Sequence, residues 1–323
     1  MSGANSINNG SYLDNANIAF QERFQDLYGA TAPGSYQTFA EVVPTDAKVT
    51  QVDAFGAFGA TWREWVGPKV FMTTRLYTQQ VTLKRWEKSF YLDRMDYQYD
   101  RTGKVGRKIN QFLSGASFYD KIATDVLVAN GTGYDGVALY SSSHPHGASG
   151  ATQSNVTTSA FSENAVEAAM IAMQSYQDEA GEPLGGGIVA DTIMVGPKNM
   201  IAALEFAGVD RKVWVKSDGT FGHEGATSTS IVGGFAMNNI WQGKFTVVVN
   251  PRLVGAYDDY WYLFSSSTGA KAVIIYEGRA PVAIAKTQME DDLRFFQDKM
   301  AWSMEADAVG ASGAWMTTYA GIL

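Results

Sequence analysis

The chain of 323 residues contains no cysteine, only three histidines and only eight prolines. The lack of cysteine excludes disulfides and thiolate chemistry, and it fits synthesis in a reducing cytoplasm. No stretch approaches about 18 uninterrupted apolar residues. The first residues, MSGANSINNGSYLDNAN, lack the basic and apolar regions of a signal peptide. We therefore expect neither a membrane span nor a secretion signal.

Charged residues make up only 18% of the chain, and they are unevenly spread. Residues 48–108 hold 12 Lys and Arg against 6 Asp and Glu, a balance of +6, whereas the remainder holds 13 against 27, a balance of −14. Complementary potentials steer association and fix its register. The split predicts a subunit whose basic segment lies across an acidic neighbour.

Residues 1–36 are rich in Asn, Gly and Ser and predict an N-terminal arm. One short patch, Phe20, Phe24 and Leu27, has helical spacing. Arg23 is the only basic residue of the arm, so the arm does not resemble a tail that binds nucleic acid.

The next segment, 37–100, predicts an extended loop. Residues 48–54 and 79–91 alternate as strands do, and the sequence between them is rich in Gly, Trp and Phe. An isolated two-stranded ribbon is marginally stable in water. We expect another surface to cover it.

A long helix is predicted over residues 104–130. Apolar side chains recur at helical spacing from Val105 to Leu127, and Asn130 with Gly131 supplies an end signal. Such a rod would be roughly 35 to 40 Å long.

Further elements follow in mixed order. A helix is expected from Ser162 to Tyr176, a buried strand at 192–195 and a helix at 199–207. Strands are expected at 245–249, 260–264, 273–276, 282–286 and 299–306. Because there is no regular alternation of strands and helices, the order predicts an α+β protein.

Several motifs carry a family resemblance. WREWVG at 62–67, WEKSF at 86–90, YDGVALYSSSHP at 134–145 and TIMVGP at 192–197 resemble the Mu-like major head subunits of tailed bacteriophages. The resemblance implies the HK97-like capsid fold, with an N-terminal arm, an extended β loop, a spine-helix peripheral domain and an axial domain. The implied ranges are 1–36 for the arm, 37–100 for the loop, 101–187 for the spine helix and peripheral domain, 188–280 for the axial domain, and 281–323 for the return to the peripheral domain.

The resemblance also implies a function. The chain would be a structural protein, the major capsid subunit of a tailed phage or prophage, and not an enzyme. It would assemble with itself as hexamers and pentamers into an icosahedral shell around double-stranded DNA, which it contacts weakly and without sequence preference. Scaffold, portal and decoration proteins are further candidate partners. We expect no cofactor, metal or membrane, and a location in the virion after assembly in the host cytoplasm.

The predicted interface residues are the basic and aromatic side chains of the loop, which would cover a neighbour's spine helix. They are Trp62, Arg63, Trp65, Lys69, Phe71, Arg75, Lys84, Arg85, Trp86 and Lys88. The expected inward face of the spine helix consists of Ile109, Phe112, Leu113, Ile122 and Val126.

Chemistry at the histidines is the main alternative. His144 and His146 beside Ser141 to Ser143 could form a metal site or a nucleophile with its base. A zinc site needs three or four ligands, and His223 lies far away in sequence. We therefore expect a polar turn that needs Pro145 and not the imidazoles.

Two acidic groups could bind Ca²⁺ or act as an acid and base, namely 290–292 and 258–259. Adjacent residues on a strand point to opposite faces, so solvated turns or partners for the basic loop are the favoured interpretation. A covalent link from Lys69, Lys84 or Lys88 to Asn250 is less favoured than non-covalent association. Two other classes stay open: a Ser/His hydrolase, and a carbohydrate-binding tail or spike protein with exposed tryptophans.

Overall fold

The computed structural model describes residues 35–55, 64–69, 76–99, 104, 107–108, 112, 118–146, 151–178, 181, 183–184, 187–209, 211–213, 236–266, 269–286 and 291–323. The chain forms two compact units, each built from segments far apart in sequence. Unit 1 comprises residues 1–52, 80–126 and 274–311, and unit 2 comprises residues 53–79, 127–273 and 312–323. The mixture of helices and strands confirms the predicted α+β class.

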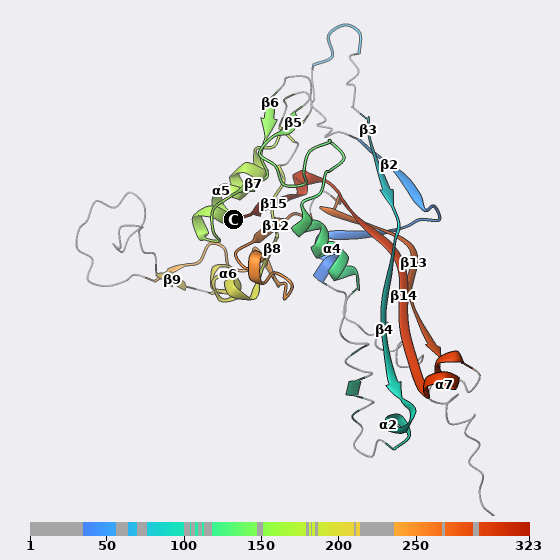
Figure 1. Ribbon diagram of the computed structural model, residues 1–323. Helices are drawn as coiled ribbons and strands as arrows, with labels where there is room; N and C mark the ends of the chain where they lie inside the picture. Colours follow the sequence, from blue (N-terminus) through green and yellow to red (C-terminus); the bar gives the residue numbers. More distant parts are fainter. Residues whose placement is uncertain are drawn as a thin grey trace, which may run out of the picture. The chain divides into compact units, whose positions relative to one another are not determined.

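Unit 1 is built on a four-stranded sheet in the order β1-β13-β14-β4 (Figure 1). Two of its strands are 14 residues long, and they run side by side with β4. Its elements are η1 (Ser35–Thr38), β1 (Ala40–Pro44), β4 (Lys84–Asp93), α2 (Arg94–Gln98), β13 (Val273–Lys286), α7 (Asp292–Gln297) and β14 (Lys299–Ser312).

The pairing of β4 with β14 is antiparallel and runs from Lys84 opposite Ala308 to Asp93 opposite Lys299. Because side chains alternate across a sheet, the even-numbered residues of both strands share one face. On that face Leu92, Met300 and Trp302 form a buried core, and Phe112 packs against it. Trp302 stacks on Phe90 with ring centroids 5.2 Å apart.

Helix α4 (Phe118–Ala129) packs directly on β14 at a glycine. A Cβ atom at Gly310 would lie 2.4 Å from a methyl group of Val126 and 2.8 Å from one of Ile122. A side chain at this position would therefore push the helix away from the sheet. Ile122 is buried and Val126 is half-buried, so both predicted spine residues face inward.

Unit 2 contains a five-stranded sheet in the order β11-β8-β12-β15-β7. Its three central strands are buried along their whole length, which explains their apolar sequences. The elements are β5 (His144–His146), β6 (Ala151–Gln153), β7 (Val156–Thr157), α5 (Glu163–Gln174), β8 (Thr192–Val195), η3 (Pro197–Asn199), α6 (Met200–Gly208), β9 (Arg211–Val213), β10 (Ala236–Asn238), β11 (Thr246–Val249), η4 (Gly255–Tyr257), β12 (Trp261–Phe264), η5 (Trp315–Thr317) and β15 (Thr318–Gly321).

Several sequence predictions in this unit are confirmed. The strand at 192–195 is β8, and the helix expected from Ser162 is α5, whose N-cap hydroxyl of Ser162 accepts from the backbone N–H of Ala165. The helix expected at 199–207 is α6. In each case a local signal, such as a cap or a short apolar run, coincides with the observed boundary.

The structure divides the segment predicted as one extended loop between two sheets. Only β2 (Val49–Phe55) and β3 (Leu76–Thr82) form a separate two-stranded sheet. β1 and β4 belong instead to the sheet of unit 1, because β4 pairs with β14 over ten residue positions, buries Leu92 and half-buries Trp86 and Phe90. The range 37–100, predicted as the loop, therefore includes two strands of this sheet, and the limits of the loop stay a prediction.

The predicted domain limits also differ from the two units. Residues 127–187 share unit 2 with the range assigned to the axial domain, and β13 runs through the expected limit at residue 280. Residues 312–323 do not return to the sheet of unit 1, because β15 lies between β12 and β7 in unit 2.

The predicted spine helix is described in parts. Residues 104, 107, 108 and 112 are helical, as is α4, and the positions between residues 112 and 118 lie outside the described residues. In the described part of the chain, no helix is long and apolar enough to cross a membrane.

Candidate subunit interface

The predicted loop tip presents an exposed aromatic side chain. Trp65 is 74% exposed and the adjacent Val66 is 70% exposed. The indole Nε1 of Trp65 donates to the carbonyl of Gly67 at 2.8 Å, and the Lys69 ammonium lies 5.1 Å from the centre of the ring. Gly67 has a φ of 82°, a value that favours glycine and closes this small turn. The local bonds hold the indole ring outward.

The base of the loop is attached within unit 2. The side-chain amide of Gln79 donates to the carbonyl of Thr132 at 3.0 Å. Tyr77 packs edge-on against Tyr134 with ring centroids 5.5 Å apart. These contacts join β3 to the 131–140 turn, a link between distant segments that sequence reasoning did not find.

Trp86 and Lys88 lie against their own chain. The indole Nε1 of Trp86 donates to the carbonyl of Ala308 at 2.9 Å, and the Lys121 ammonium lies 4.9 Å from the ring centre. The Lys88 ammonium donates to the carbonyl of Phe112 at 2.6 Å, and burial lowers its pKa. The alternation of β4 directs the half-buried Trp86 toward the helical face of unit 1, and its further burial by a neighbour stays a prediction.

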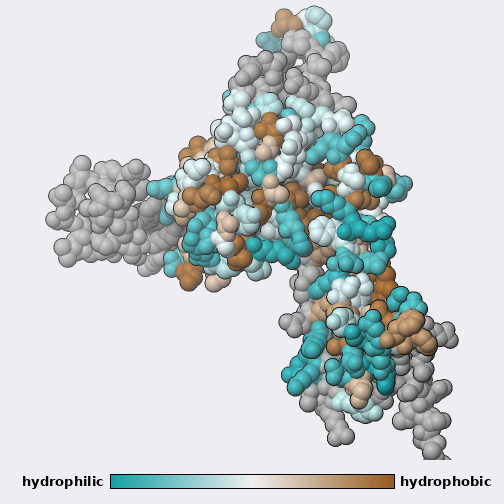
Figure 2. Space-filling model, viewed as in Figure 1, coloured by the Kyte–Doolittle hydropathy of each residue, from teal (hydrophilic) through white to brown (hydrophobic). Residues whose placement is uncertain are grey.

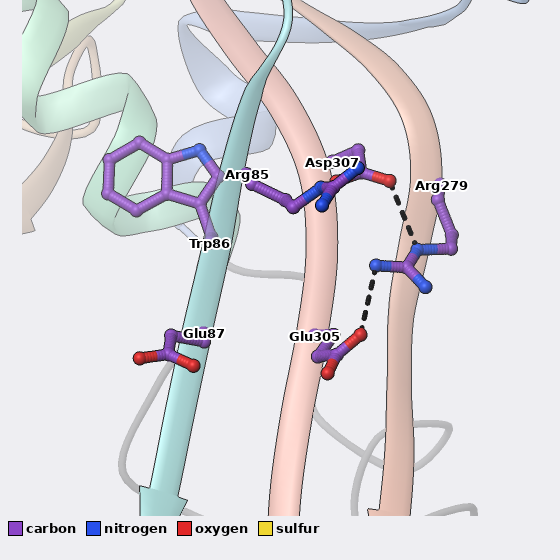
Figure 3. A pocket seen from close by; sticks show the side chains of 6 residues that line it. All are labelled: Arg85, Trp86, Glu87, Arg279, Glu305 and Asp307. Atoms are coloured by element: carbon purple, nitrogen blue, oxygen red, sulfur yellow. Dashed lines mark hydrogen bonds and ion pairs between the residues drawn. The ribbon is translucent and has the colours of Figure 1, made fainter.

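Two charged residues of β4, Arg85 and Glu87, line a groove together with Trp86 and with charged residues of β13 and β14 (Figure 3). The groove has a volume of about 590 Å³ and lies among β4, β13 and β14. Arg279 reaches from β13 toward β14, where its Nη2 lies 3.3 Å from Glu305 and its Nε lies 3.2 Å from Asp307 (Figure 3). Arg85 lies 3.7 Å from the second oxygen of Asp307 and is 89% exposed.

One cross-strand pair in this groove is unfavourable. Glu87 lies directly opposite Glu305 in the register of β4 and β14. Like charges at such a position destabilise a sheet. Arg279 offsets the charge of Glu305, but among the described residues no cation lies within ion-pair distance of Glu87. The groove therefore presents a carboxylate and a guanidinium, Glu87 and Arg85, to solvent.

The end of unit 1 formed by α2 and α7 is apolar and exposed. Arg94 at the start of α2 binds both carboxylate oxygens of Asp298, at 2.8 and 3.0 Å, and this hydrogen bonding raises the pKa of Arg94. Phe295 and Phe296 are 76% and 77% exposed on α7, and Tyr91 is 65% exposed at the end of β4. Large apolar side chains gathered in this way are typical of contact surfaces.

A second apolar surface lies on unit 2. Met200, Ile201 and Leu204 on α6 are exposed, as is Ile240. Figure 2 shows hydrophobic residues in brown over the region of α5 and α6. Because the opposite side of α6 packs Ala203 and Phe206 into the core, the helix is apolar on both sides.

His144 belongs to the core and not to a polar turn. Its side chain has no exposed area, its Nδ1 lies 2.6 Å from Asp135 Oδ2, and its ring stacks on Trp315 with centroids 4.2 Å apart. Its Nε2 lies 3.1 Å from Asn155 Oδ1. The expectation that the imidazoles are dispensable is therefore wrong for His144, since partners distant in sequence hold it.

The orientation of Asn155 fixes the role of Nε2. The side-chain NH₂ of Asn155 donates to the carbonyls of Leu139 and Trp315, at 2.8 and 3.2 Å, and its Oδ1 accepts from the backbone N–H of Ser141 at 2.9 Å. Nε2 of His144 must then be a donor. Both ring nitrogens are thus engaged away from the serine hydroxyls, which is not the geometry of a serine nucleophile with its base.

The other candidate groups also have structural roles. Lys198 lies 3.4 Å from Asp258 and 2.7 Å from Asp259, and the hydrogen bond to Asp259 raises the pKa of Lys198. Asn250 is buried, and its Oδ1 accepts from the backbone N–H of Arg252. Within the described ranges, no group of three His, Asp or Glu side chains could hold a metal ion.

Six predicted site residues lie outside the described residues: Trp62, Arg63, Phe71, Arg75, Ile109 and Leu113. Of the others, Trp65 and Lys69 are at the tip, and Lys84, Arg85, Trp86 and Lys88 are on β4. Phe112, Ile122 and Val126 are on the helical side of the sheet of unit 1. The structure therefore separates the predicted interface into a tip and a sheet edge.

A model of the phage capsid protein family matches residues 76–320 of this chain. The match covers well over half of the sequence, and the chain belongs to this family. No protein of curated function matches the chain at a significant level.

Solved capsids share the fold. The procapsid of bacteriophage JBD30 matches with a TM-score of 0.52 and 18% identity, over 97% of this chain and 75% of that chain. The mature capsid of bacteriophage PhiM1 matches with a TM-score of 0.51 and 11% identity, over 90% of this chain and 87% of that chain. The capsid of the native GTA particle matches with a TM-score of 0.50 and 11% identity, over 90% of this chain and 92% of that chain.

The fold is therefore the HK97-like capsid fold, as the sequence motifs implied. Together with the family, it identifies a major capsid protein, a structural component of the bacteriophage virion. Neither the hydrolase nor the tail or spike protein is favoured by the family match or by the environment of His144.

Proposed function

We propose that copies of this chain assemble as hexamers and pentamers into a closed icosahedral shell that encloses double-stranded DNA. The observation that carries the proposal is the tip around Trp65, because an indole that is 74% exposed contributes little to its own unit. Aromatic anchors typically supply most of the free energy of a protein interface. The tip of one copy would insert its indole against a neighbouring copy.

Charge would set the register of this contact. The basic balance of residues 48–108 opposes an acidic remainder. Arg85 and Arg94 already have acidic partners in their own unit, Asp307 and Asp298. The charge available to a neighbour is therefore smaller than the sequence total of +6. Electrostatic attraction would affect the rate and orientation of docking more than its affinity.

The finer identity rests on the sequence motifs. WREWVG, WEKSF and YDGVALYSSSHP resemble the Mu-like head subunits, and this resemblance supports the proposal that the chain is one of them. In this proposal the chain has no catalytic role, assembles in the host cytoplasm and ends in the virion. Scaffold, portal and decoration proteins would join the same shell, and DNA would be held weakly because the subunit is acidic overall.

The test is replacement of Trp65 by Ser. Because the side chain is exposed, the variant should keep the circular dichroism spectrum and melting temperature of the wild type. Negative-stain microscopy and sedimentation of the Trp65→Ser variant should show no assembled particles. Trp65→Phe is the matched control, because it keeps an aromatic anchor, and it should still assemble. An unfolded Trp65→Ser variant, or one that still forms shells, would contradict the proposal.

A further inference from the structure

The groove bordered by β4, β13 and β14 contains two carboxylates that face each other. Glu87 lies directly opposite Glu305 in the antiparallel pairing of β4 with β14, and opposite residues point to the same face. Arg279 pairs with Glu305 and Asp307, at 3.3 and 3.2 Å (Figure 3). Within the described ranges, no cation pairs with Glu87. The groove can therefore accept one more positive charge.

The groove also has a place for an aromatic ring. Its volume of about 590 Å³ is typical of concave sites that enclose small molecules. The Arg85 side chain lines the groove and is almost fully exposed, so a ring can reach its guanidinium. Guanidinium groups stack on aromatic rings. An occupant that carries a cation and an aromatic ring side by side would fit these groups.

The loop tip of this chain carries such a pair. The Lys69 ammonium lies 5.1 Å from the centre of the Trp65 ring, and both residues are exposed. In the groove, Arg85 and Glu87 are two residues apart on β4, a separation of about 7 Å along the strand. The cation and the ring of the tip can therefore meet the carboxylate and the guanidinium of the groove at the same time.

The tip is held in shape before it docks. The indole Nε1 of Trp65 donates to the Gly67 carbonyl at 2.8 Å, and Pro68 restricts the backbone that follows. A preformed turn loses little conformational entropy on binding. The exposed indole and ammonium are therefore presented together.

A lysine also lies over an indole at Lys244 and Trp241, at 5.3 Å from the ring centre. There the Trp241 ring packs against Phe206 and Phe245, with centroids 5.7 and 6.0 Å away. Because the ring belongs to the packing of its own unit, this pair cannot enter a groove on another copy. It serves as a control for the pair at the tip.

We infer that the tip of one copy docks in this groove on a second copy. Lys69 lies against Glu87 and Glu305, and the Trp65 ring lies against the Arg85 guanidinium. The inference rests on the proposed function, in which the tip contacts a neighbouring copy, and it assigns the receiving surface to β4, β13 and β14. A lysine between the two carboxylates replaces repulsion by attraction. Docking therefore also stabilises the sheet that receives the tip.

Charge reversal on both sides of the contact tests this inference. Lys69→Glu places a carboxylate against two others, and Glu87→Lys places an ammonium against Lys69. Each change should lower the fraction of protein in sedimenting particles at least about tenfold. The double variant again has a pair of opposite charges, so it should recover assembly to within about threefold of the wild type.

The stability of the free subunit separates this contact from a role in folding. Urea unfolding of the Glu87→Lys subunit should show no loss of stability, because the change removes the repulsion with Glu305. A Glu87→Lys variant that both unfolds more easily and fails to assemble would contradict the inference.

Lys244→Glu is the matched control, because it makes the same exchange at an exposed lysine that lies over an indole. It should assemble as the wild type does. An equal loss of assembly in Lys69→Glu and Lys244→Glu would overturn the inference. A double variant that assembles no better than the single variants would do the same.

Cross-linking locates the contact directly, because the chain has no cysteine of its own. Pro68→Cys alters the neighbour of Lys69, and Ser89→Cys alters an exposed position two residues beyond Glu87 on β4. A mixture of the two single variants, assembled and treated with a short bismaleimide, should give a cross-linked dimer on a denaturing gel. Each variant treated alone should give far less dimer.

Two outcomes of the cross-linking would count against the inference. If a chain that carries both cysteines cross-links only within itself, the tip occupies its own groove. If closed shells form without a cross-linked dimer, the tip docks elsewhere, and the inference fails while the proposed function stands. A dimer in the mixture without closed shells in negative-stain microscopy would support the inference, and only the proposed function would fail.

Discussion

The imidazole of His144 lies flat against the indole of Trp315, with ring centroids 4.2 Å apart and an angle of 4° between the planes. The two residues are far apart in sequence, yet Asn155 also bonds both of them, through the His144 ring and the Trp315 carbonyl. This cluster joins the turn at 132–138, β5 and η5 within unit 2. It connects segments that are distant in sequence.

Replacing His144 by Ala should therefore destabilise the protein strongly. The substitution leaves the buried Asp135 side chain without its ring partner, and leaving a buried polar group unpaired costs about 1 to 3 kcal/mol. Urea unfolding followed by circular dichroism measures the change. Ser142→Ala, an exposed position in the same segment, is the control and should change stability by less than about 0.5 kcal/mol. Equal stability of the two variants would refute this role for His144.

A second prediction concerns Glu87 and Glu305, which face each other across β4 and β14. Replacing Glu87 by Lys turns a like-charge pair into an opposite-charge pair and should raise the unfolding free energy by about 0.5 kcal/mol. Glu87→Gln removes the repulsion only, so it should give a smaller gain. Both gains should shrink at high salt, and a loss of stability in Glu87→Lys would show that the pair does not repel in solution.

Gly310 gives a third prediction, because helix α4 contacts the sheet there. Gly310→Ala places a methyl group against Val126 and Ile122 and should cost about 1 to 3 kcal/mol. In a Val126→Ala background the same change should cost less, since the nearest methyl group is gone. Thermal unfolding of the four proteins of this cycle measures the difference. If Gly310→Ala cost the same unfolding free energy in both backgrounds, the contact between residue 310 and Val126 would be contradicted.

Alkaline pH should unfold unit 2. Burial raises the pKa of Tyr140, Tyr176 and Tyr262 above the usual value for tyrosine. Because the folded state favours the protonated side chains, these tyrosines contribute their full stabilisation of the fold below about pH 10, the pH at which unfolded tyrosine ionises. That stabilisation is lost as the pH rises further. Absorbance of tyrosinate at 295 nm should rise for these groups only together with the loss of circular dichroism. Early ionisation without unfolding would show that they are accessible.

Assembly should also depend on salt. The Debye length falls from about 14 Å at 0.05 M to about 4 Å at 0.5 M, so docking of the basic segment on an acidic neighbour should slow. Light scattering after mixing measures the rate, and a non-ionic solute of equal osmolality is the control. A rate that does not change with salt would leave only the apolar contacts as the driving force.

Local signals in the sequence predicted part of this structure well. Ser162 as a cap and the apolar run at 192–195 each specify an element through neighbouring residues alone. The fold itself followed from ordered motifs. These features depend on interactions between residues that are close in sequence.

The limits of the loop and the environment of His144 could not be predicted in the same way. Whether β4 projects or pairs depends on β14, more than 200 residues later, and the alternation of 84–93 fits both. His144 looked like a turn residue because Asp135, Asn155 and Trp315 come together only in the folded chain. Gly310 similarly carries no signal without the helix that lies on it.

The place of β15 in its sheet has a consequence for the timing of synthesis. Residues 318–321 fill the position between β12 and β7, and they leave the ribosome after the other strands that the described residues form. Until then one edge of β12 has no paired strand, and the sheet of unit 2 is incomplete. A nascent chain therefore cannot finish the sheet of unit 2, or offer it for assembly, before residues 318–321 have been translated.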